Sequence, residues 1–260
     1  MHGGILPDGT FNTAAGKAEA QQAKNVTAAF APETTALSAP AVFLPGAPHQ
    51  KETAYTVRSL AGRAPDIRQP GHAAWDRCEE IKPLHEPWQQ RKKGSTRFRA
   101  GYDEAYFYFR FLVTDSLLVS VDGNAEIAVA GGDRVEMFFA ADSTLKEYYC
   151  LEISPQGRVL DYRAAHYRQF DDAWDLEGLE VSASPHAKGY QVSGRIPMAF
   201  FSTLLGKRGP LKGSSIHAGV FRADKTGPGA SDGFNWYSWI MPQSPKPDFH
   251  IPSAFGIFRF

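Results

Sequence analysis

The stretch DRVEMFFAAD, residues 133–142, alternates apolar and polar side chains. Val135, Met137 and Phe139 fall at every second position, and Glu136 lies between them. Successive side chains of a β-strand point to opposite faces of the sheet. The pattern therefore predicts a strand with an apolar face toward the core, and Glu136 is expected on the other face.

Similar short runs, broken by Gly, Pro and Asp, continue from Tyr55 to the end of the chain. This pattern of short runs and turn residues is typical of an all-β sandwich or barrel. One short helix is expected over residues 197–205, because Pro197 stands at its first turn and Gly206 just past its end. The expected strands are residues 54–59, 75–81, 96–102, 105–114, 134–140, 147–154, 158–163, 179–184, 190–196, 216–222, 234–240 and 256–260.

Residues 1–52 differ in composition from the rest of the chain. They are rich in Ala, Thr, Pro and Gly and show no sustained apolar period, which favours a flexible extension before a folded domain over residues 53–260. The first thirty residues lack the basic start and apolar run of a secretory signal. No stretch has the ~20 apolar residues of a membrane-spanning helix. A secreted protein whose signal was removed and a cytosolic protein both remain open.

The charges balance, with 28 Lys and Arg against 28 Asp and Glu. Nucleic acids and anionic membranes are bound by clustered positive charge, so neither is expected as a partner. A neutral partner such as a sugar fits better. Cys78 and Cys150 stand in apolar, strand-like runs and are expected to be buried free thiols, with a disulfide between them left open.

Several motifs follow one another in a characteristic order. They are RFRAGYDEAYFYFRFLVTD (97–115), DRVEMFFAAD (133–142), EYYCLEISPQGRVLDY (147–162), GYQVSGRIPMAFF (189–201) and YSWIMPQSPKPDFHIPSAFGIFRF (237–260). The D-x-V-E-x-F block and the terminal DFHIPSAFG block are the most specific of them. Together they resemble the family 9 carbohydrate-binding modules, and the terminal block is most similar to the free-standing branch of that family rather than to modules appended to xylanases.

The resemblance carries expectations about fold and function. It implies a jelly-roll-like antiparallel β-sandwich that has no catalytic activity and works beside glycoside hydrolases in extracellular polysaccharide breakdown. Characterised modules of the family bind the ends of glucan and xylan chains, with the sugar held between two tryptophans and hydrogen-bonded by polar side chains. Structural calcium is also reported in the family.

The family's binding residues match this sequence in part. The acidic residue corresponds to Glu136. The first tryptophan falls at Ala130 and the second at Phe249. The arginine and asparagine expected on the following strand fall at Cys150 and Glu152.

Other residues could complete a binding site. Trp236 and Trp239 lie three apart, so on a strand they face opposite sides and at most one is in the core. Trp239 is expected to be structural and Trp236 to offer a stacking surface. For Arg222 a surface ion pair with Asp224 is the alternative to sugar binding. The predicted ligand-binding residues are Glu136, Trp236, Phe249, Arg222, Asn235 and His250.

Calcium is a possible cofactor, because oxygen ligands for this ion often gather near strand ends. The acidic residues near such ends are Asp115, Asp122, Asp133 and Asp142. A different function class is a haem-binding sandwich for electron transfer, with Met137 and His217 as iron ligands. A third is a degenerate module kept as an interaction or structural protein. Catalysis by Glu136 and Glu152 as a glycosidase pair would need a deep cleft and is not expected.

Overall fold

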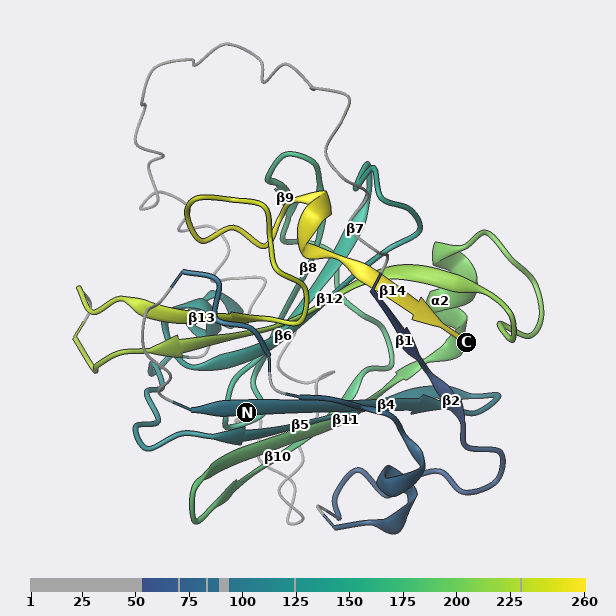
Figure 1. Ribbon diagram of the computed structural model, residues 1–260, viewed down its shortest axis with the longest axis horizontal. Coiled ribbons are helices and arrows are strands. Elements are labelled where there is room, and N and C mark those ends of the chain that lie inside the picture. The colour runs from purple at the N-terminus through teal and green to yellow at the C-terminus, as the bar shows by residue number, and fades with distance from the viewer. Residues whose placement is uncertain (1–52, 70, 83, 89–93, 124, 230) are drawn as a thin grey trace, which may run out of the picture.

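Two β-sheets stacked on one another make up the described part of the chain (Figure 1). The computed structural model describes residues 53–260 apart from residues 70, 83, 89–93, 124 and 230. The predicted extension over residues 1–52 lies outside the described residues. The expected all-β sandwich with a short helix is confirmed. Among the described residues, no helix has the length and apolar character needed to cross a membrane.

The larger sheet has eight strands, in the order β1-β14-β12-β6-β7-β8-β9, with β13 paired to β12. Its strands are β1 (Ala54–Thr56), β6 (Arg134–Ala140), β7 (Tyr148–Ile153), β8 (Val159–Ala165), β9 (Gln169–Asp171), β12 (Ser215–Lys225), β13 (Phe234–Ser238) and β14 (Gly256–Arg259). The smaller sheet has six strands, in the order β10-β11-β5-β4-β2, with β3 paired to β4. Its strands are β2 (Arg58–Ser59), β3 (Glu80–Ile81), β4 (Ser95–Tyr102), β5 (Tyr106–Thr114), β10 (Glu180–His186) and β11 (Gly189–Pro197).

The sandwich is not purely antiparallel. The chain enters through β1, which pairs in parallel with β14, and continues into β2, which pairs in parallel with β4. Every other strand pair of the two sheets is antiparallel among the described residues. The entering segment thus lies at an edge of both sheets, where Val57 donates its backbone N–H to the Arg259 carbonyl at 2.8 Å.

The helical elements are short. Helix α2 (Met198–Leu204) follows β11 directly, as expected, and packs Phe201 into the core. The expected strand over residues 75–81 is wrong in its first half, where the chain forms the 3-10 helix η1 (Ala73–Arg77). The His72 ring accepts the Ala74 backbone N–H at 3.3 Å and starts this turn. Two further 3-10 turns are η2 (Glu126–Gly131) and η3 (Pro252–Ala254).

Aromatic rings fill the space between the sheets. Phe107 on β5 lies 6.1 Å from Phe139 on β6, 6.1 Å from Phe258 on β14 and 5.2 Å from Phe201 on α2, measured between ring centroids. Its side chain is fully buried. One residue of the smaller sheet therefore contacts two strands of the larger sheet and the helix.

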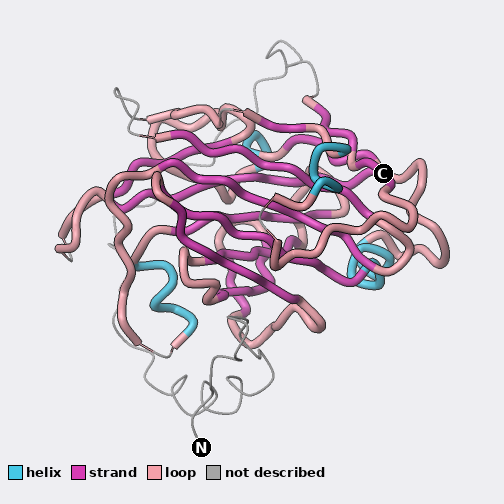
Figure 2. Tube along the Cα trace, turned by 90° about the horizontal axis from the view of Figure 1, so that it is seen from below, coloured by secondary structure: helices cyan, strands magenta, loops and turns pink. Residues whose placement is uncertain are grey.

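The outer faces of both sheets are partly covered by loops, as the second view shows (Figure 2). The closing segment, residues 241–255, contributes Phe249, Ala254 and Phe255 to a cluster on the outer face of the larger sheet. Residues 60–78 place Leu60, Ile67 and Trp75 against Tyr108 on the outer face of the smaller sheet. Cys78 and Cys150 are buried free thiols, as expected, and they lie in different clusters.

Replacing Phe107 by Ala should destabilise the fold strongly. The change removes a buried ring from the contact between the sheets and should lower the free energy of unfolding by about 3–5 kcal/mol. Leu117→Ala is the control, because the Leu117 side chain is 45% exposed, and it should change the free energy by less than about 0.5 kcal/mol. Urea titration measures both, and equal stability of the two variants would contradict this account of the core.

Candidate functional site

The outer face of the larger sheet carries the residues that the sequence singled out around Glu136. On β6, Val135 and Met137 face the core, while Glu136 and Phe138 face outward. The register places Glu136 opposite Glu152 on β7 and opposite Phe221 on β12. Two carboxylates therefore lie side by side on this face, and we call Glu136 and Glu152 the carboxylate pair.

Arg134 joins the two members of the carboxylate pair. Its Nε lies 2.9 Å from Oε1 of Glu136 and 2.5 Å from Oε2 of Glu152. Its Nη1 donates to the carbonyl of Ala130 at 2.9 Å, which fixes the guanidinium against η2. Tyr162 on β8 donates its hydroxyl to Oε1 of Glu152 at 2.9 Å. Buried charges need partners of this kind, because an unpaired buried charge is strongly destabilising.

Glu136 has a pKa far from its usual value. Burial, and then the nearby charge of Glu152, raise the pKa of Glu136 to about 8, while Arg134 opposes this shift. At neutral pH a carboxyl with such a pKa carries its proton for much of the time and can donate as well as accept a hydrogen bond. Only 2% of Glu136 is exposed, so its role in this structure is to hold Arg134 in place.

Aromatic rings border the Arg134 guanidinium. Its Cζ lies 5.3 Å from the ring centroid of Phe234 and 5.6 Å from that of Trp236, both on β13. This separation is typical of cation–π contacts. Trp236 also meets Phe249 edge to face, with centroids 5.6 Å apart, and part of its side chain remains exposed.

The closing segment covers the rest of this face. Phe249 stacks on Phe221 with centroids 4.1 Å apart and planes inclined by 10°. Its other contacts include Trp88, which donates its indole N–H to the Ser244 carbonyl at 2.9 Å. Phe249 is 5% exposed, so one of its faces is already occupied by a ring of the protein itself.

His250 is part of the same cover. Its Nδ1 lies 3.0 Å from the Tyr148 hydroxyl, and burial together with the charge of Arg168 lowers its pKa to about 3. It is therefore neutral at physiological pH. The neighbouring Asp248 was not predicted as a contact residue, yet it accepts hydrogen bonds from Tyr167 at 2.7 Å and Arg168 at 2.9 Å. The residues involved are eighty positions apart, and no spacing signal relates them.

The structure divides the six predicted ligand-binding residues between two faces of the larger sheet. Glu136, Trp236, Phe249 and His250 share the outer face. Asn235 faces the other side, where it donates to Asp224 at 3.0 Å, and Arg222 lies there too. Trp239 packs in the core and Trp236 outside it, as the spacing predicted.

The sequence matches one family over most of its length. Residues 70–259 match the family described as carbohydrate family 9 binding domain-like. The chain belongs to this family. The sequence finds no match among curated proteins.

Solved structures share the fold of this family 9 domain at low sequence identity. A proposed carbohydrate-binding protein from Bacteroides uniformis is 18% identical, with a TM-score of 0.62, over 80% of this chain and 98% of that one. A family 9 module from Caldicellulosiruptor kristjanssonii in complex with cellotriose is 15% identical, with a TM-score of 0.55, over 80% and 93% of the two chains. A family 9 module from the same organism in complex with glucose is 16% identical, with a TM-score of 0.53, over 80% of this chain and 95% of that one. At these identities the likeness establishes the fold alone.

In this family 9 domain Arg222 forms a buried ion pair, not the surface pair expected from the sequence. The Arg222 side chain is 0% exposed, and its Nη2 lies 2.6 Å from Oδ2 of Asp115 and 3.2 Å from Oδ1 of Asp224. The Tyr237 ring lies 4.9 Å from the guanidinium carbon. The correction follows from the strand pairing, which turns Arg222 inward beside a carboxylate from the other sheet.

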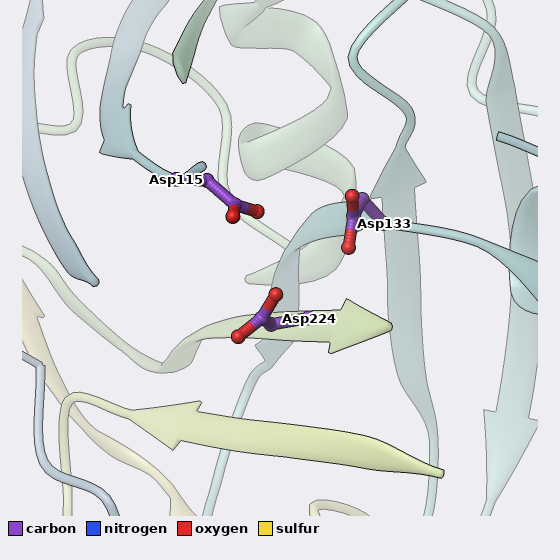
Figure 3. Close-up of side chains that lie close together, drawn as sticks. All are labelled: Asp115, Asp133 and Asp224. Atoms are coloured by element: carbon purple, nitrogen blue, oxygen red, sulfur yellow. The ribbon is translucent and has the colours of Figure 1, made fainter. Parts of the chain in front are cut away.

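Three carboxylates surround this arginine. Asp115 follows β5, Asp133 precedes β6 and Asp224 lies on β12, and Figure 3 shows them pointing toward one another. Asp133 accepts the backbone N–H of Val119 at 2.6 Å and that of Lys225 at 2.7 Å. The guanidinium of Arg222 supplies one positive charge beside these three carboxylates, and calcium binding by them stays a prediction.

Other acidic residues lie elsewhere. Asp122 and Asp142, also considered for calcium, are exposed and outside this group. A second group that the sequence did not suggest brings one carboxylate oxygen each of Glu126, Asp161 and Asp175 within 4.8 Å of one another. Asp161 also accepts the Leu176 backbone N–H at 2.5 Å. These residues come from three separate segments, so only the fold relates them.

The haem alternative does not fit the geometry. Met137 pairs with Val220 and is fully buried in the core. His217 is three residues from Val220 on β12, which turns its side chain toward the opposite face of the sheet. The two proposed iron ligands therefore lie on different sides of the larger sheet and cannot hold one iron.

Replacing Arg222 by Met should show what the buried pair contributes. Removing the guanidinium leaves Asp115 and Asp224 buried without their cation, which should lower the free energy of unfolding by about 3–5 kcal/mol. Added Ca²⁺ should raise the melting temperature of this variant more than that of the wild type, because three facing carboxylates are then left. The control Arg163→Met changes a 45% exposed arginine and should have little effect. A variant as stable as the wild type would contradict the account.

The pKa of Glu136 predicts a pH dependence of stability. The folded state binds the Glu136 proton more tightly than the unfolded state does, so this residue lowers stability as pH rises from about 4.5 toward 8. Glu136→Gln should therefore gain stability relative to the wild type across this window, by about 1.4 kcal/mol per unit of raised pKa. Urea titrations at several pH values measure the difference. Glu104→Gln, at an exposed position, is the control and should follow the wild type. Parallel curves for all three proteins would contradict the raised pKa of Glu136.

Proposed function

We propose that this family 9 domain binds a carbohydrate on the outer face of the larger sheet, beside Trp236 and Arg134, and does not transform it. Membership of the family supports a carbohydrate ligand. The solved modules in complex with cellotriose and glucose have the same fold. The observation that carries the proposal is the position of Trp236, whose partly exposed indole lies on the same face as Glu136.

The chemistry of this face suits a sugar. A pyranose presents an apolar C–H face, which packs on an aromatic ring, and hydroxyls, which need fixed hydrogen-bond partners. Trp236 supplies the ring, and the largely buried guanidinium of Arg134 lies beside it, with Cζ 5.6 Å from the ring centroid. Glu136 and Glu152 hold Arg134 from below, so they act as positioning residues. Ala130 lies where the resemblance implies a tryptophan, and Trp236 offers an indole beside the same outer-face cluster.

We infer the finer role from the family resemblance. The ligands expected are glucan or xylan oligosaccharides or the ends of their chains, and the role is to support polysaccharide breakdown outside the cell beside glycoside hydrolases. One observation favours a second function, that of an interaction or structural protein. Phe249 corresponds to the family's second tryptophan, but its ring is stacked on Phe221, so that face of the ring is not open to a sugar.

Titration calorimetry of the full chain with glucose, cellotriose and xylotriose tests the binding proposal. Trp236→Ala should weaken the binding of the preferred sugar at least tenfold, which corresponds to about 1.4 kcal/mol, because the stacking surface is lost. Trp174→Ala is the matched control, since Trp174 packs against Tyr149 and Phe200 instead, and it should leave the affinity unchanged.

Two results would count against the proposal. If none of the three sugars binds, the carbohydrate function fails and the interaction role is favoured, while the family and the fold stand. If the sugar binds equally well to Trp236→Ala, the site lies elsewhere on the domain. Chromatography of the sugar after long incubation should recover it unchanged, because no transformation is proposed.

A further inference from the structure

The outer face of the smaller sheet carries a cluster of arginines that the proposed function does not use. Arg97 and Arg99 lie on β4, and Arg110 lies on β5 directly opposite Arg99. All three side chains point outward, because Phe98 and Phe111 of the same strands face the core. Like charges directly opposite one another on a sheet are destabilising. The cluster therefore needs negative charge nearby.

Two acidic residues supply part of that charge. Arg99 is bound by Glu80, with Nε to Oε2 at 2.8 Å, and by Asp76, with Nη1 to Oδ1 at 3.0 Å. Arg97 lies farther from Glu80, at 3.8 Å. Lys82 also contacts Glu80, at 3.1 Å. Arg97, Arg99 and Lys82 thus share two carboxylates, and with Arg110 beside them positive charge remains in excess.

Arg110 is the member without a carboxylate. Its Nε donates to the side-chain oxygen of Gln191 on β11 at 3.0 Å, and no carboxylate of the described residues lies within 4.0 Å of its guanidinium. Burial, and then the charges of Arg99 and Arg97, lower its pKa. This is the shift of a half-buried cation whose charge is not balanced.

The protein holds Arg110 in one orientation. Gln191 is buried on the outer face and donates its amide N–H to the Ser193 hydroxyl at 3.1 Å. That contact turns the amide oxygen of Gln191 toward Arg110. A polar group fixed in this way is preorganised, and little ordering is needed when a ligand binds.

A hollow of ≈ 210 Å³ opens over this cluster, lined by Asp76, Glu80, Arg97, Arg99, Arg110 and Leu112. Its volume is below the ~300–1,000 Å³ of typical small-molecule sites. The space suits one charged group, or one unit of a larger ligand, rather than a long chain. Asp76 of η1 borders the hollow, and strands β3, β4 and β5 supply its other lining residues.

We propose that this hollow is an anion-binding site that takes a carboxylate, sulfate or phosphate group against Arg110. A guanidinium presents a planar set of N–H donors that matches such groups with two parallel hydrogen bonds. The bound anion balances the charge of Arg110 and lies between it and Arg97. An acidic sugar or a free inorganic anion both carry this chemistry, and the test separates them.

The site is independent of the proposed sugar site. The two lie on the outer faces of different sheets, with the aromatic core between them. Loss of one should therefore leave the other intact. Trp236→Ala should keep its affinity for anions, and a variant of Arg110 should keep its affinity for a neutral sugar.

The experiment is titration calorimetry of the full chain with glucuronate, inorganic phosphate and sulfate, at one ionic strength adjusted with chloride. At least one of the three should bind, and Arg110→Gln should weaken that binding at least tenfold. Arg163→Gln is the matched control, because Arg163 is 45% exposed on β8 and pairs with Asp171, and it should change the affinity less than twofold. Preference for glucuronate over phosphate and sulfate indicates an acidic sugar, and the reverse indicates an inorganic or esterified anion.

The remaining outcomes overturn the proposal. It fails if none of the three anions binds under these conditions, or if Arg110→Gln binds as tightly as the wild type. Melting temperatures show whether Arg110→Gln is folded. If it is not, Arg97→Gln decides, since Arg97 is 46% exposed and tolerates replacement. Unchanged anion affinity in that variant contradicts the site.

Discussion

The ion pair between Arg222 and Asp115 constrains the whole sandwich. Asp115 follows β5 of the smaller sheet and Arg222 lies on β12 of the larger, so their 2.6 Å contact joins the two sheets. Both side chains are almost completely buried, and neither charge could remain there without the other. The aromatic core supplies most of the attraction between the sheets but is tolerant of small shifts, whereas a buried charge pair requires one geometry. The stacking at this end of the sandwich is fixed by that requirement.

This constraint also shapes the outer face. The register of β6 and β12 pairs Arg134 with Ala223 and Val135 with Arg222, so two buried arginines occupy adjacent rows on opposite faces of one sheet. Arg222 is held by aspartates between the sheets, and Arg134 is held by the carboxylate pair outside. The inner cluster is sealed by the core. The outer one is bordered by a partly exposed tryptophan, and that difference in cover is the reason for proposing the sugar site on the outer face.

The sequence predicted the features that depend on local periodicity and missed those that depend on distant partners. The strand over residues 134–140 has the expected bounds because its alternating side chains are enough to define it. The burial of Arg222 could not be predicted, since its partner Asp115 is 107 positions away. Phe249 aligned with a sugar-binding tryptophan, yet its stacking on Phe221 depends on how the closing segment folds back. Likewise, Arg97, Arg99 and Arg110 come together only through the pairing of β4 with β5.

The two thiols lie on the outer faces of different sheets. Cys78 packs with Leu60, Ile67 and Trp75 over the smaller sheet, and Cys150 belongs to the cluster that the closing segment covers on the larger sheet. Burial raises the pKa of Cys78 to about 11 and that of Cys150 also well above its usual range. Thiolate is the form that reacts with oxidants and disulfides, so both sulfurs are chemically quiet while the chain is folded. Both cysteines of the chain are free thiols, so no covalent cross-link ties the covering segments to the sheets or one sheet to the other.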